Sequence, residues 1–409
     1  MTRKNDLFLD YQSEFDNGKD LSDLLEYEIN KYFYAKPYSG GSLLSSMFKF
    51  YLHVAALGNG FRTFKNLVIS SAYYNYNNHL REFGYDIVAP PGMSKRNSYS
   101  FNSYNIVKKV FNIESLINNN QLHKLLKYED NLLYELENEL TLFFEKCKIR
   151  GIVLPSDLGF LNRLSINAAR KNNIPSFIFQ HGGVPVYYNL VDFNRTDYLV
   201  VWGSKVKSAY ISMGWDENKI FVSGHPFYRT VPGRLRFTLD NILVLTKSAS
   251  EAQLQDRKKS ILYLLMIKRV LISFGIKKVR LRTHPSESPK WYQELLGEDF
   301  FVLDRCNLSE SLNAATLVIG PNSTTLIDSL AHGVNYHVFE PIDNEGKTLM
   351  NLSIVPPLDG LDERIPISRN VDELTQNIRD RNYMDLSVFN EFADTRLNLG
   401  FFKEVVKIK

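Results

Sequence analysis

The stretch that decides the fold runs from residue 279 to residue 340, and it holds two motifs that each follow an apolar strand. VRLRTHP occupies residues 279–285, and LVIGPNSTT occupies residues 317–325. The carboxyl ends of parallel strands lie on one edge of a sheet, which is where ligands bind in such folds. A His-Pro turn and a Ser/Thr-rich turn on that edge are typical of a phosphate site. The stretch therefore favours a nucleotide-dependent enzyme.

Short apolar segments alternate with helical segments along most of the chain, which predicts parallel sheets. Strands are expected at residues 66–71, 86–89, 151–154, 176–179, 198–202, 220–223, 241–245, 278–282, 300–303, 317–319 and 336–339. Helices are expected at residues 21–34, in two pieces between 103 and 147, at 158–171, 251–274 and 324–332, and in the tail after residue 371. No repeat at a solenoid period interrupts this alternation.

The length of 409 residues exceeds what a single hydrophobic core usually supports. We expect a Rossmann-like domain over residues 1–230, a second over residues 231–385, and a helical segment at 386–409 that packs back across the first. Gly and Pro punctuate residues 224–233, as in an interdomain linker. The predicted fold class is α/β, with two Rossmann-like domains whose parallel sheets face a central cleft.

The composition is that of a globular protein, with 44% hydrophobic and 23% charged residues and a net charge of +4. Local Lys and Arg clusters fit either solvated helix faces or attraction to an anionic membrane or a polyanionic substrate. Neither a signal peptide nor a membrane span is evident, so we expect a cytoplasmic protein, with peripheral association at the inner face of the plasma membrane as an alternative. No nucleic-acid partner is indicated.

Cysteine and histidine spacing gives no sign of a metal centre or a disulfide framework. Cys147 and Cys306 are the two cysteines, and the eight histidines include no His-x-x-x-His pair. No Gly-x-x-x-x-Gly-Lys-Ser/Thr motif occurs, which disfavours ATP hydrolysis, and no Gly-x-Gly-x-x-Gly follows a strand, which disfavours a nicotinamide cofactor. We therefore expect neither metal nor cofactor. The oligomeric state stays open.

The turn after residue 319 is the first candidate for the phosphate. Gly320 permits close approach, and the backbone N–H groups and dipole of the following helix favour an anion. Asn322 and the hydroxyls of Ser323, Thr324 and Thr325 add polar groups. A plain helix cap is the alternative explanation of the same residues.

Four further side chains follow neighbouring strands and are expected to join that turn. Arg282 ends one strand, and Pro285 fixes a turn that places the imidazole of His284 at the strand tip. Lys247 follows the strand at 241–245. Glu340 follows another strand, where a carboxylate accepts hydrogen bonds from ribose hydroxyls in dinucleotide sites. These residues are assigned to the nucleotide.

The first domain is expected to supply the catalytic and acceptor groups. Asp157 lies between a strand and a helix, as a catalytic carboxylate or as a helix cap. Gln180, His181 and Gly182 follow the next strand. His181 is assigned to acid–base chemistry, with contact to the phosphate as the alternative, and Gln180 and Gly182 are assigned to substrate binding.

The combination of motifs resembles GT-B glycosyltransferases of bacterial surface-polysaccharide synthesis, especially the CMP-sugar-dependent sialyl-, polysialyl- and Kdo transferases. His284-Pro285 and Ser323-Thr324-Thr325 correspond to the motifs that bind the nucleotide phosphate in those families. The Kdo transferases of capsule synthesis imply a catalytic carboxylate at Asp157. CDP-glycerol polymerases and, more distantly, UDP-GlcNAc 2-epimerases share a similar pattern. The Asp/Glu-Asp-Gly motif of inverting sialyltransferases is absent, which favours a retaining reaction.

The resulting hypothesis is a metal-independent transferase that moves Kdo or a nonulosonic acid from a CMP donor, its co-substrate, to a growing capsule, O-antigen or lipooligosaccharide glycan. The acceptor is a glycan, free or lipid-linked. Three alternatives remain: a CDP-glycerol- or UDP-sugar-dependent transferase on the same fold, an isomerase like UDP-GlcNAc 2-epimerase, and a non-catalytic glycan-assembly subunit. The sequence leaves donor sugar, linkage and stereochemistry open.

Overall fold

The structure is a computed structural model of the 409-residue chain. It describes residue 28 and residues 64–73, 75–91, 103–119, 121–126, 132–157, 159–180, 196–228, 232–247, 254–285, 287–342, 346, 349 and 362–407. The description of residues 254–258 covers the backbone alone.

The first sheet has six strands in the order β2-β1-β3-β4-β5-β6. They are β1 (Leu67–Ser70), β2 (Asp86–Val88), β3 (Gly151–Leu154), β4 (Ser176–Phe179), β5 (Tyr198–Val201) and β6 (Ile220–Val222). The pairings of β1 with β2 and β3, and of β3 with β4, are parallel. The direction of the strand order changes between β1 and β3.

The second sheet also has six strands, in the order β12-β11-β10-β7-β8-β9, and all its pairings are parallel. They are β7 (Ile242–Leu245), β8 (Val279–Arg282), β9 (Phe301–Leu303), β10 (Leu317–Gly320), β11 (Tyr336–Phe339) and β12 (Ile367–Ser368). This is the strand order of a Rossmann fold, which changes direction between its first and fourth strands, here β7 and β10.

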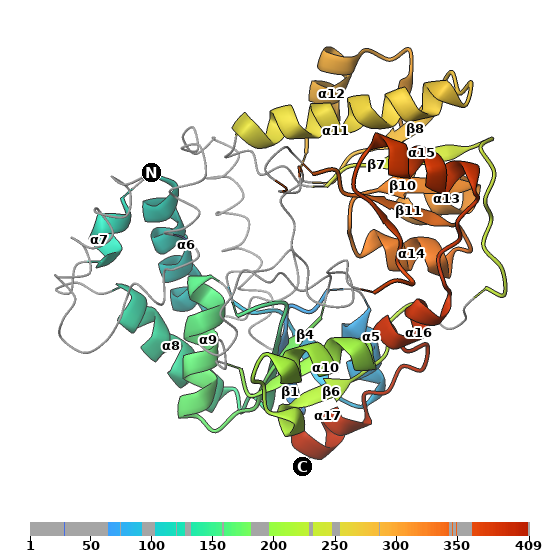
Figure 1. Ribbon diagram of the computed structural model, residues 1–409. Coiled ribbons are helices and arrows are strands. Elements are labelled where there is room, and N and C mark those ends of the chain that lie inside the picture. Colours follow the sequence, from blue (N-terminus) through green and yellow to red (C-terminus); the bar gives the residue numbers. More distant parts are fainter. Residues whose placement is uncertain are drawn as a thin grey trace. The chain divides into compact units, whose positions relative to one another are not determined.

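Helices lie in the described connections between consecutive strands of both sheets, as is usual for parallel strands (Figure 1). Around the first sheet they are α5 (Tyr76–Glu82), α6 (Tyr104–Asn118), α7 (Leu122–Leu126), α8 (Leu132–Lys146), α9 (Phe160–Lys171), α10 (Ser204–Ser212) and the short 3-10 helix Glu217–Lys219. Those after β7 are α11 (Leu254–Ser273), α12 (Pro289–Leu296), α13 (Leu308–Ala314), α14 (Thr325–Ala331), α15 (Val371–Arg379), α16 (Ser387–Phe392) and α17 (Gly400–Val405).

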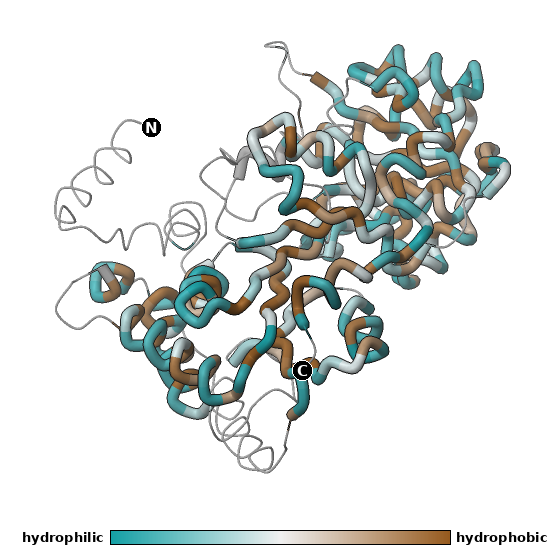
Figure 2. Tube along the Cα trace, turned by 90° about the horizontal axis from the view of Figure 1, so that it is seen from below, coloured by the Kyte–Doolittle hydropathy of each residue, from teal (hydrophilic) through white to brown (hydrophobic). Residues whose placement is uncertain are grey.

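Several strands are buried along their whole length, as expected where helices cover both faces of a parallel sheet. All four residues of β1, β3, β7, β10 and β11 are buried. Figure 2 shows the contrast, with hydrophobic colour gathered in the strands and mixed colour along the outer helices. Each sheet has its own core: α6, α8 and α9 contribute to the first, and α11 and α15 to the second.

The chain divides into two compact units. The first comprises Met1–Phe179, Phe193–Leu199 and Gly400–Lys409, and the second comprises Gln180–Asp192 and Val200–Leu399. Within the first unit, α17 packs on the sheet: the Phe402 ring lies 4.8 Å from that of Phe177, and the Tyr85 hydroxyl donates to the main-chain oxygen of Val406. The domain limits 1–230, 231–385 and 386–409 stay predictions, as does the central cleft.

The expected elements are confirmed wherever they fall on described residues. Most strand bounds agree within one residue, and the α/β class with two parallel sheets is correct. The region 103–147 forms three helices rather than two, because α7 follows the break after Asn118. The short strand β12 was not expected, since two residues carry no periodicity. The predicted helix at 21–34 lies outside the described residues except for Glu28, which is helical.

Candidate nucleotide site

The strand ends of the second sheet bring together residues that are far apart in the sequence. β7 and β10 are neighbours, β8 lies beside β7, and β11 lies beside β10. The residues after these four strands therefore share one edge of the sheet. Because the strand order changes direction between β7 and β10, this edge is the position where open α/β sheets bind ligands.

Lys247 connects the two central strand ends. Its ammonium group donates a hydrogen bond of 2.8 Å to the main-chain oxygen of Asn322, in the turn after β10. Burial lowers the pKa of Lys247 to about 8, although the nearby carboxylate of Glu340 opposes the shift. The side chain is thus a cation at neutral pH, and it loses its proton, and with it the charge, close to the physiological pH range.

Glu340 is the counterpart of this lysine. The residue is 2% exposed, and its Oε1 accepts a 2.6 Å hydrogen bond from the backbone N–H of Asn322. Burial raises the pKa of Glu340 to about 7, while the Asn322 N–H, Lys247 and Arg369 act in the opposite direction. The structure thus uses one carboxylate oxygen to hold the turn after β10, which differs from a role confined to ribose hydroxyls.

Two buried polar atoms at this edge lack hydrogen-bond partners among the residues that the structure describes. They are Oδ1 of Asn322 and Oε2 of Glu340. Buried polar atoms are nearly always paired, so each exception calls for an explanation such as a ligand or water. Their position at the change in strand direction favours a ligand.

His284 is fixed by a carboxylate that the sequence did not single out. Its backbone N–H donates to Oε2 of Glu287 and to the hydroxyl oxygen of Thr246, both at 3.0 Å. Glu287 also accepts a 2.8 Å hydrogen bond from the Tyr292 hydroxyl. An acidic residue three positions after His284, across a proline turn, is the signal that would have identified Glu287.

The imidazole of His284 is less basic than an ordinary histidine. Burial lowers its pKa, Lys247 lowers it further, and Glu287 opposes the shift. The neutral imidazole of His284 is therefore favoured at pH 7, and in that form a ring N–H can donate a hydrogen bond but the side chain supplies no full charge. The interaction with Lys247 places the two side chains in the same electrostatic environment.

The Ser/Thr turn closes on itself. The N–H of Thr325 donates to the Ser323 hydroxyl at 3.3 Å, and those of Leu326 and Ile327 donate to the main-chain oxygens of Ser323 and Thr324. Thr324 is the N-cap residue, and its side chain makes no cap hydrogen bond. The three half-buried hydroxyls are donors that this turn offers, and those of Ser323 and Thr325 lie within hydrogen-bond distance of each other, at 3.3 Å.

Gly320 is required by packing. A Cβ atom at this position would lie 2.2 Å from the hydroxyl oxygen of Tyr336. That hydroxyl donates a 2.6 Å hydrogen bond to the main-chain oxygen of Pro321, at the start of the turn. The glycine thus leaves space for the buried Tyr336, whose hydroxyl fixes the start of the turn through this hydrogen bond.

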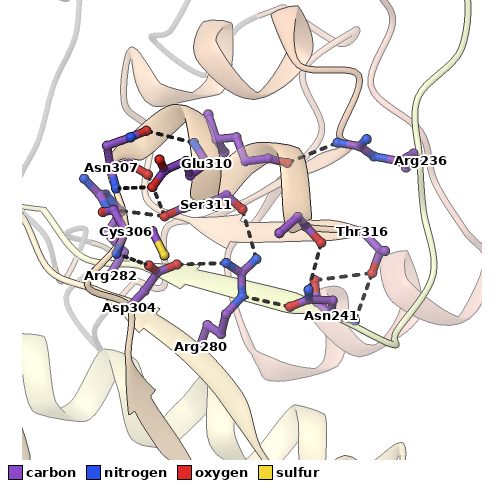
Figure 3. A network of polar contacts seen from close by, with 12 residues as sticks. Arg236, Asn241, Arg280, Arg282, Asp304, Cys306, Asn307, Glu310, Ser311 and Thr316 are labelled. Carbon is purple, nitrogen blue, oxygen red and sulfur yellow. Dashed lines mark hydrogen bonds and ion pairs between the residues drawn. The ribbon is translucent and has the colours of Figure 1, made fainter.

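Arg282 is engaged away from the other strand-end residues. Its guanidinium donates to the main-chain oxygen of Cys306 at 2.6 Å and to the Ser311 hydroxyl at 3.3 Å, next to the Arg280 network (Figure 3). Pro285 is exposed and forms the turn after β8. Of the residues assigned to the nucleotide, Lys247, Asn322 and Glu340 are joined by hydrogen bonds, and His284 interacts with Lys247.

Asp157 lies in the first unit after β3, the strand at which the order of the first sheet changes direction. It is 8% exposed. Helix α9 begins at Phe160 with Gly159 as its N-cap, so Asp157 is not the capping residue. The N–H of Phe160 instead donates a 2.9 Å hydrogen bond to Oε1 of Glu28.

Gln180 has a structural partner at the end of β4. Its side-chain oxygen accepts a 2.8 Å hydrogen bond from the backbone N–H of Trp202, which fixes this strand end. His181 and Gly182 lie outside the described residues.

In the described part of the chain, no group of three His, Cys, Asp or Glu side chains is arranged to hold a metal ion. Within that same part, no helix has the length and hydropathy needed to cross a bilayer.

No protein-family model matches the chain, and no curated protein matches it either. Among solved structures, the UDP-GlcNAc 2-epimerase from Methanocaldococcus jannaschii is similar at 12% identity and a TM-score of 0.49, covering 83% of this chain and 98% of its own. A putative UDP-N-acetylglucosamine 2-epimerase from Listeria monocytogenes is similar at 13% identity and a TM-score of 0.45, and the match covers 82% of this chain and 93% of that protein. The lipopolysaccharide outer core galactosyltransferase WaaB is similar at 10% identity and a TM-score of 0.40, and the match covers 67% of this chain and 80% of that protein. Likeness at this level assigns no family.

Proposed function

We propose that the second unit binds the nucleotide of an activated sugar and that the chain is a glycosyltransferase. The observation that carries the proposal is the Lys247–Asn322–Glu340 arrangement at the change in strand direction between β7 and β10. This is the general ligand position of open α/β sheets. At the same edge lie a buried cation and two buried polar atoms that have no hydrogen-bond partner among the described residues.

The phosphate would lie against Lys247, the hydroxyls of Ser323, Thr324 and Thr325, and the imidazole of His284. Lys247 supplies the positive charge, and the neutral His284 supplies a hydrogen-bond donor. These groups would stabilise the charge that develops on the leaving phosphate as the bond to the sugar breaks. The unpartnered oxygens of Asn322 and Glu340 would accept hydrogen bonds from the nucleoside.

For the donor we propose a CMP-activated acidic sugar, Kdo or a nonulosonic acid. The support is the resemblance of the His-Pro and Ser/Thr motifs to those of CMP-sugar-dependent transferases. Asp157 would attack the anomeric carbon in a retaining reaction or deprotonate the acceptor hydroxyl in an inverting one. In both cases the phosphate would leave with the electron pair of the bond between the anomeric carbon and the phosphate oxygen. The acceptor oxygen would then displace Asp157 from the anomeric carbon in the retaining route, or attack that carbon directly in the inverting route. His181 would act in acid–base chemistry, with Gly182 and Gln180 near the acceptor.

The first test measures binding of CMP, CDP and UDP to the full chain by calorimetry. We expect CMP to bind most tightly, and Lys247→Met to weaken binding at least about tenfold, since a charged hydrogen bond is lost. Lys290→Met is the matched control, because Lys290 is 81% exposed on α12. Absence of binding by all three nucleotides would refute the nucleotide site.

The second test measures nucleotide release from a panel of CMP-, CDP- and UDP-activated donors with a glycan acceptor. We expect Asp157→Asn to retain CMP binding and to lose turnover. Turnover by that variant at the wild-type rate would remove Asp157 from the mechanism. A converted sugar nucleotide formed without acceptor would identify an isomerase. Nucleotide binding with no turnover of any donor would identify a non-catalytic subunit.

A further inference from the structure

Helix α11 carries apolar side chains on two opposite faces. The inner face packs in the core of the second sheet through Tyr263, Leu264, Ile267, Val270 and Leu271. On the outer face, Leu262, Leu265 and Ile272 are 41%, 45% and 52% exposed. Together with the exposed Arg269, they recur at spacings of three, four and three residues, which places them on one side of the helix. These four residues are called the outer stripe.

The sequence around the outer stripe is basic throughout. Residues 257–286 contain no Asp or Glu and nine Lys or Arg, namely Arg257, Lys258, Lys259, Lys268, Arg269, Lys277, Lys278, Arg280 and Arg282. Arg280 and Arg282 are engaged inside the unit. The other seven belong to α11 and the turn after it. Among them, the Lys268 ammonium lies 5.4 Å from the centre of the Phe300 ring, whereas Arg269, Lys277 and Lys278 are exposed.

We propose that the outer stripe of α11 docks the protein on an anionic lipid surface. Basic side chains near the surface attract the negative headgroups, and exposed aliphatic side chains insert at the boundary between headgroups and acyl chains. Figure 1 shows α11 along one side of the second sheet. The helix therefore lies on the membrane with its inner face still packed on the sheet, and it does not cross the bilayer.

The chemistry of the stripe distinguishes a membrane from other anionic or apolar partners. Single-stranded nucleic acids are bound through aromatic side chains on which bases stack, whereas the exposed side chains here are aliphatic. A second copy of the chain, pairing stripe against stripe about a two-fold axis, would place Arg269 and its basic neighbours against the same residues. Such like-charge contact disfavours self-association.

The test is co-sedimentation of the full chain with vesicles, one set of phosphatidylcholine alone and one that also contains phosphatidylglycerol. We expect binding to the anionic vesicles, weak binding to the neutral ones, and weaker binding as salt is raised. The variant Leu262→Gln/Leu265→Gln/Ile272→Gln should bind the anionic vesicles at least about tenfold less, because apolar burial is lost. The variant Lys277→Glu/Lys278→Glu should lose binding while retaining the leucines.

Two control variants carry changes of the same kinds elsewhere. Leu142→Gln replaces a leucine that is 60% exposed on α8, and Lys124→Glu/Lys146→Glu reverses two exposed lysines. Both should bind like the wild type, and circular dichroism checks that every variant is folded. The proposal fails if the wild type ignores anionic vesicles, or if a folded triple variant binds like the wild type. It also fails if sedimentation velocity shows a dimer that the triple variant abolishes while vesicle binding persists. Vesicle binding does not depend on whether the second unit binds a nucleotide, so the failure of one proposal can be told from the failure of the other.

Discussion

The ammonium group of Lys247 lies 2.8 Å from the main-chain oxygen of Asn322, so that the residues after β7 and β10 are joined where the second sheet changes direction. The same Asn322 donates its N–H to Glu340 after β11. A cation and a carboxylate that both sit far from their ordinary pKa are costly to bury. Perturbed groups of this kind are concentrated at functional sites.

Nucleotide binding should depend on pH through Lys247. The phosphate of CMP is doubly ionised above a pKa of about 6, so it does not titrate between pH 7 and 9. We expect the affinity for CMP to fall as pH rises through 8, where Lys247 loses its proton. In Glu340→Gln the midpoint should move to lower pH, because the carboxylate that raises the pKa of Lys247 is removed.

Calorimetric titration across this pH range checks the expectation, with Lys247→Met as a control whose weaker binding should show no such dependence. A midpoint that stays in place in Glu340→Gln would mean that the two groups are not coupled.

Gly320→Ala should destabilise the second unit by about 1–3 kcal/mol, because the added methyl group overlaps the hydroxyl of Tyr336. Tyr336→Phe alone should cost about 1 kcal/mol, since Pro321 loses its hydrogen-bond donor. The double variant should be more stable than the sum of both costs implies, because removing the hydroxyl removes the closest contact. Urea unfolding of the four proteins measures this, and strict additivity would contradict it.

The positions of the site residues could be predicted because the alternation of strands and helices is plain in this sequence. Lys247, Asn322 and Glu340 each follow a buried strand, His284 follows the half-buried β8, and parallel strands place such residues on one edge. The sequence could not show that Gly320 accommodates Tyr336, or that Glu340 binds the N–H of Asn322. Those contacts depend on the register of neighbouring strands and on side-chain packing.

The partners of other predicted residues were also hidden in tertiary structure. Gln180 looks like a ligand residue in the sequence, yet its side-chain oxygen accepts from Trp202, 22 residues later. Glu28 accepts from the first N–H of α9, 132 residues away, so a cap at Asp157 was not needed. Contacts over such separations leave no local pattern.

Asp328 should make stability fall as pH rises. Burial raises its pKa to about 7, and its Oδ1 accepts from the Tyr228 hydroxyl. A carboxyl group whose pKa is raised on folding binds its proton more tightly in the folded state, so stability decreases between about pH 4 and pH 7. The loss of unfolding free energy is at most about 1.4 kcal/mol for each tenfold difference between the acid constants of Asp328 in the folded and unfolded states.

Asp328→Asn keeps the acceptor and removes the ionisation, so we expect the variant to gain stability over the wild type at pH 8 but not at pH 4. Thermal unfolding at both pH values measures the difference. Tyr228→Phe removes the hydroxyl that donates to Asp328, and it should lower the stability of the protein at both pH values. An Asp328→Asn effect that is equal at both pH values would show that Asp328 titrates normally.

Arg280 should be the most costly arginine of β8 to replace. Its guanidinium donates to Asp304 at 2.9 Å, to Oδ1 of Asn241 at 2.8 Å and to the main-chain oxygen of Ser311 at 2.9 Å (Figure 3). The side chain of Asp304 is 1% exposed. Arg280→Met would leave that carboxylate buried without its cation, which costs roughly 3–5 kcal/mol.

Arg282→Met is the matched control, since Arg282 lies two residues later on the same face of β8 and donates to the main-chain oxygen of Cys306 and to the Ser311 hydroxyl. We expect it to cost about 1 kcal/mol, because no buried carboxylate loses its partner. In Arg280→Met/Asp304→Leu, the free energy of unfolding should recover part of the loss, since the buried charge is gone with the arginine. Equal losses for the two arginine variants in chemical unfolding would show that the Arg280–Asp304 pair adds nothing beyond ordinary hydrogen bonds.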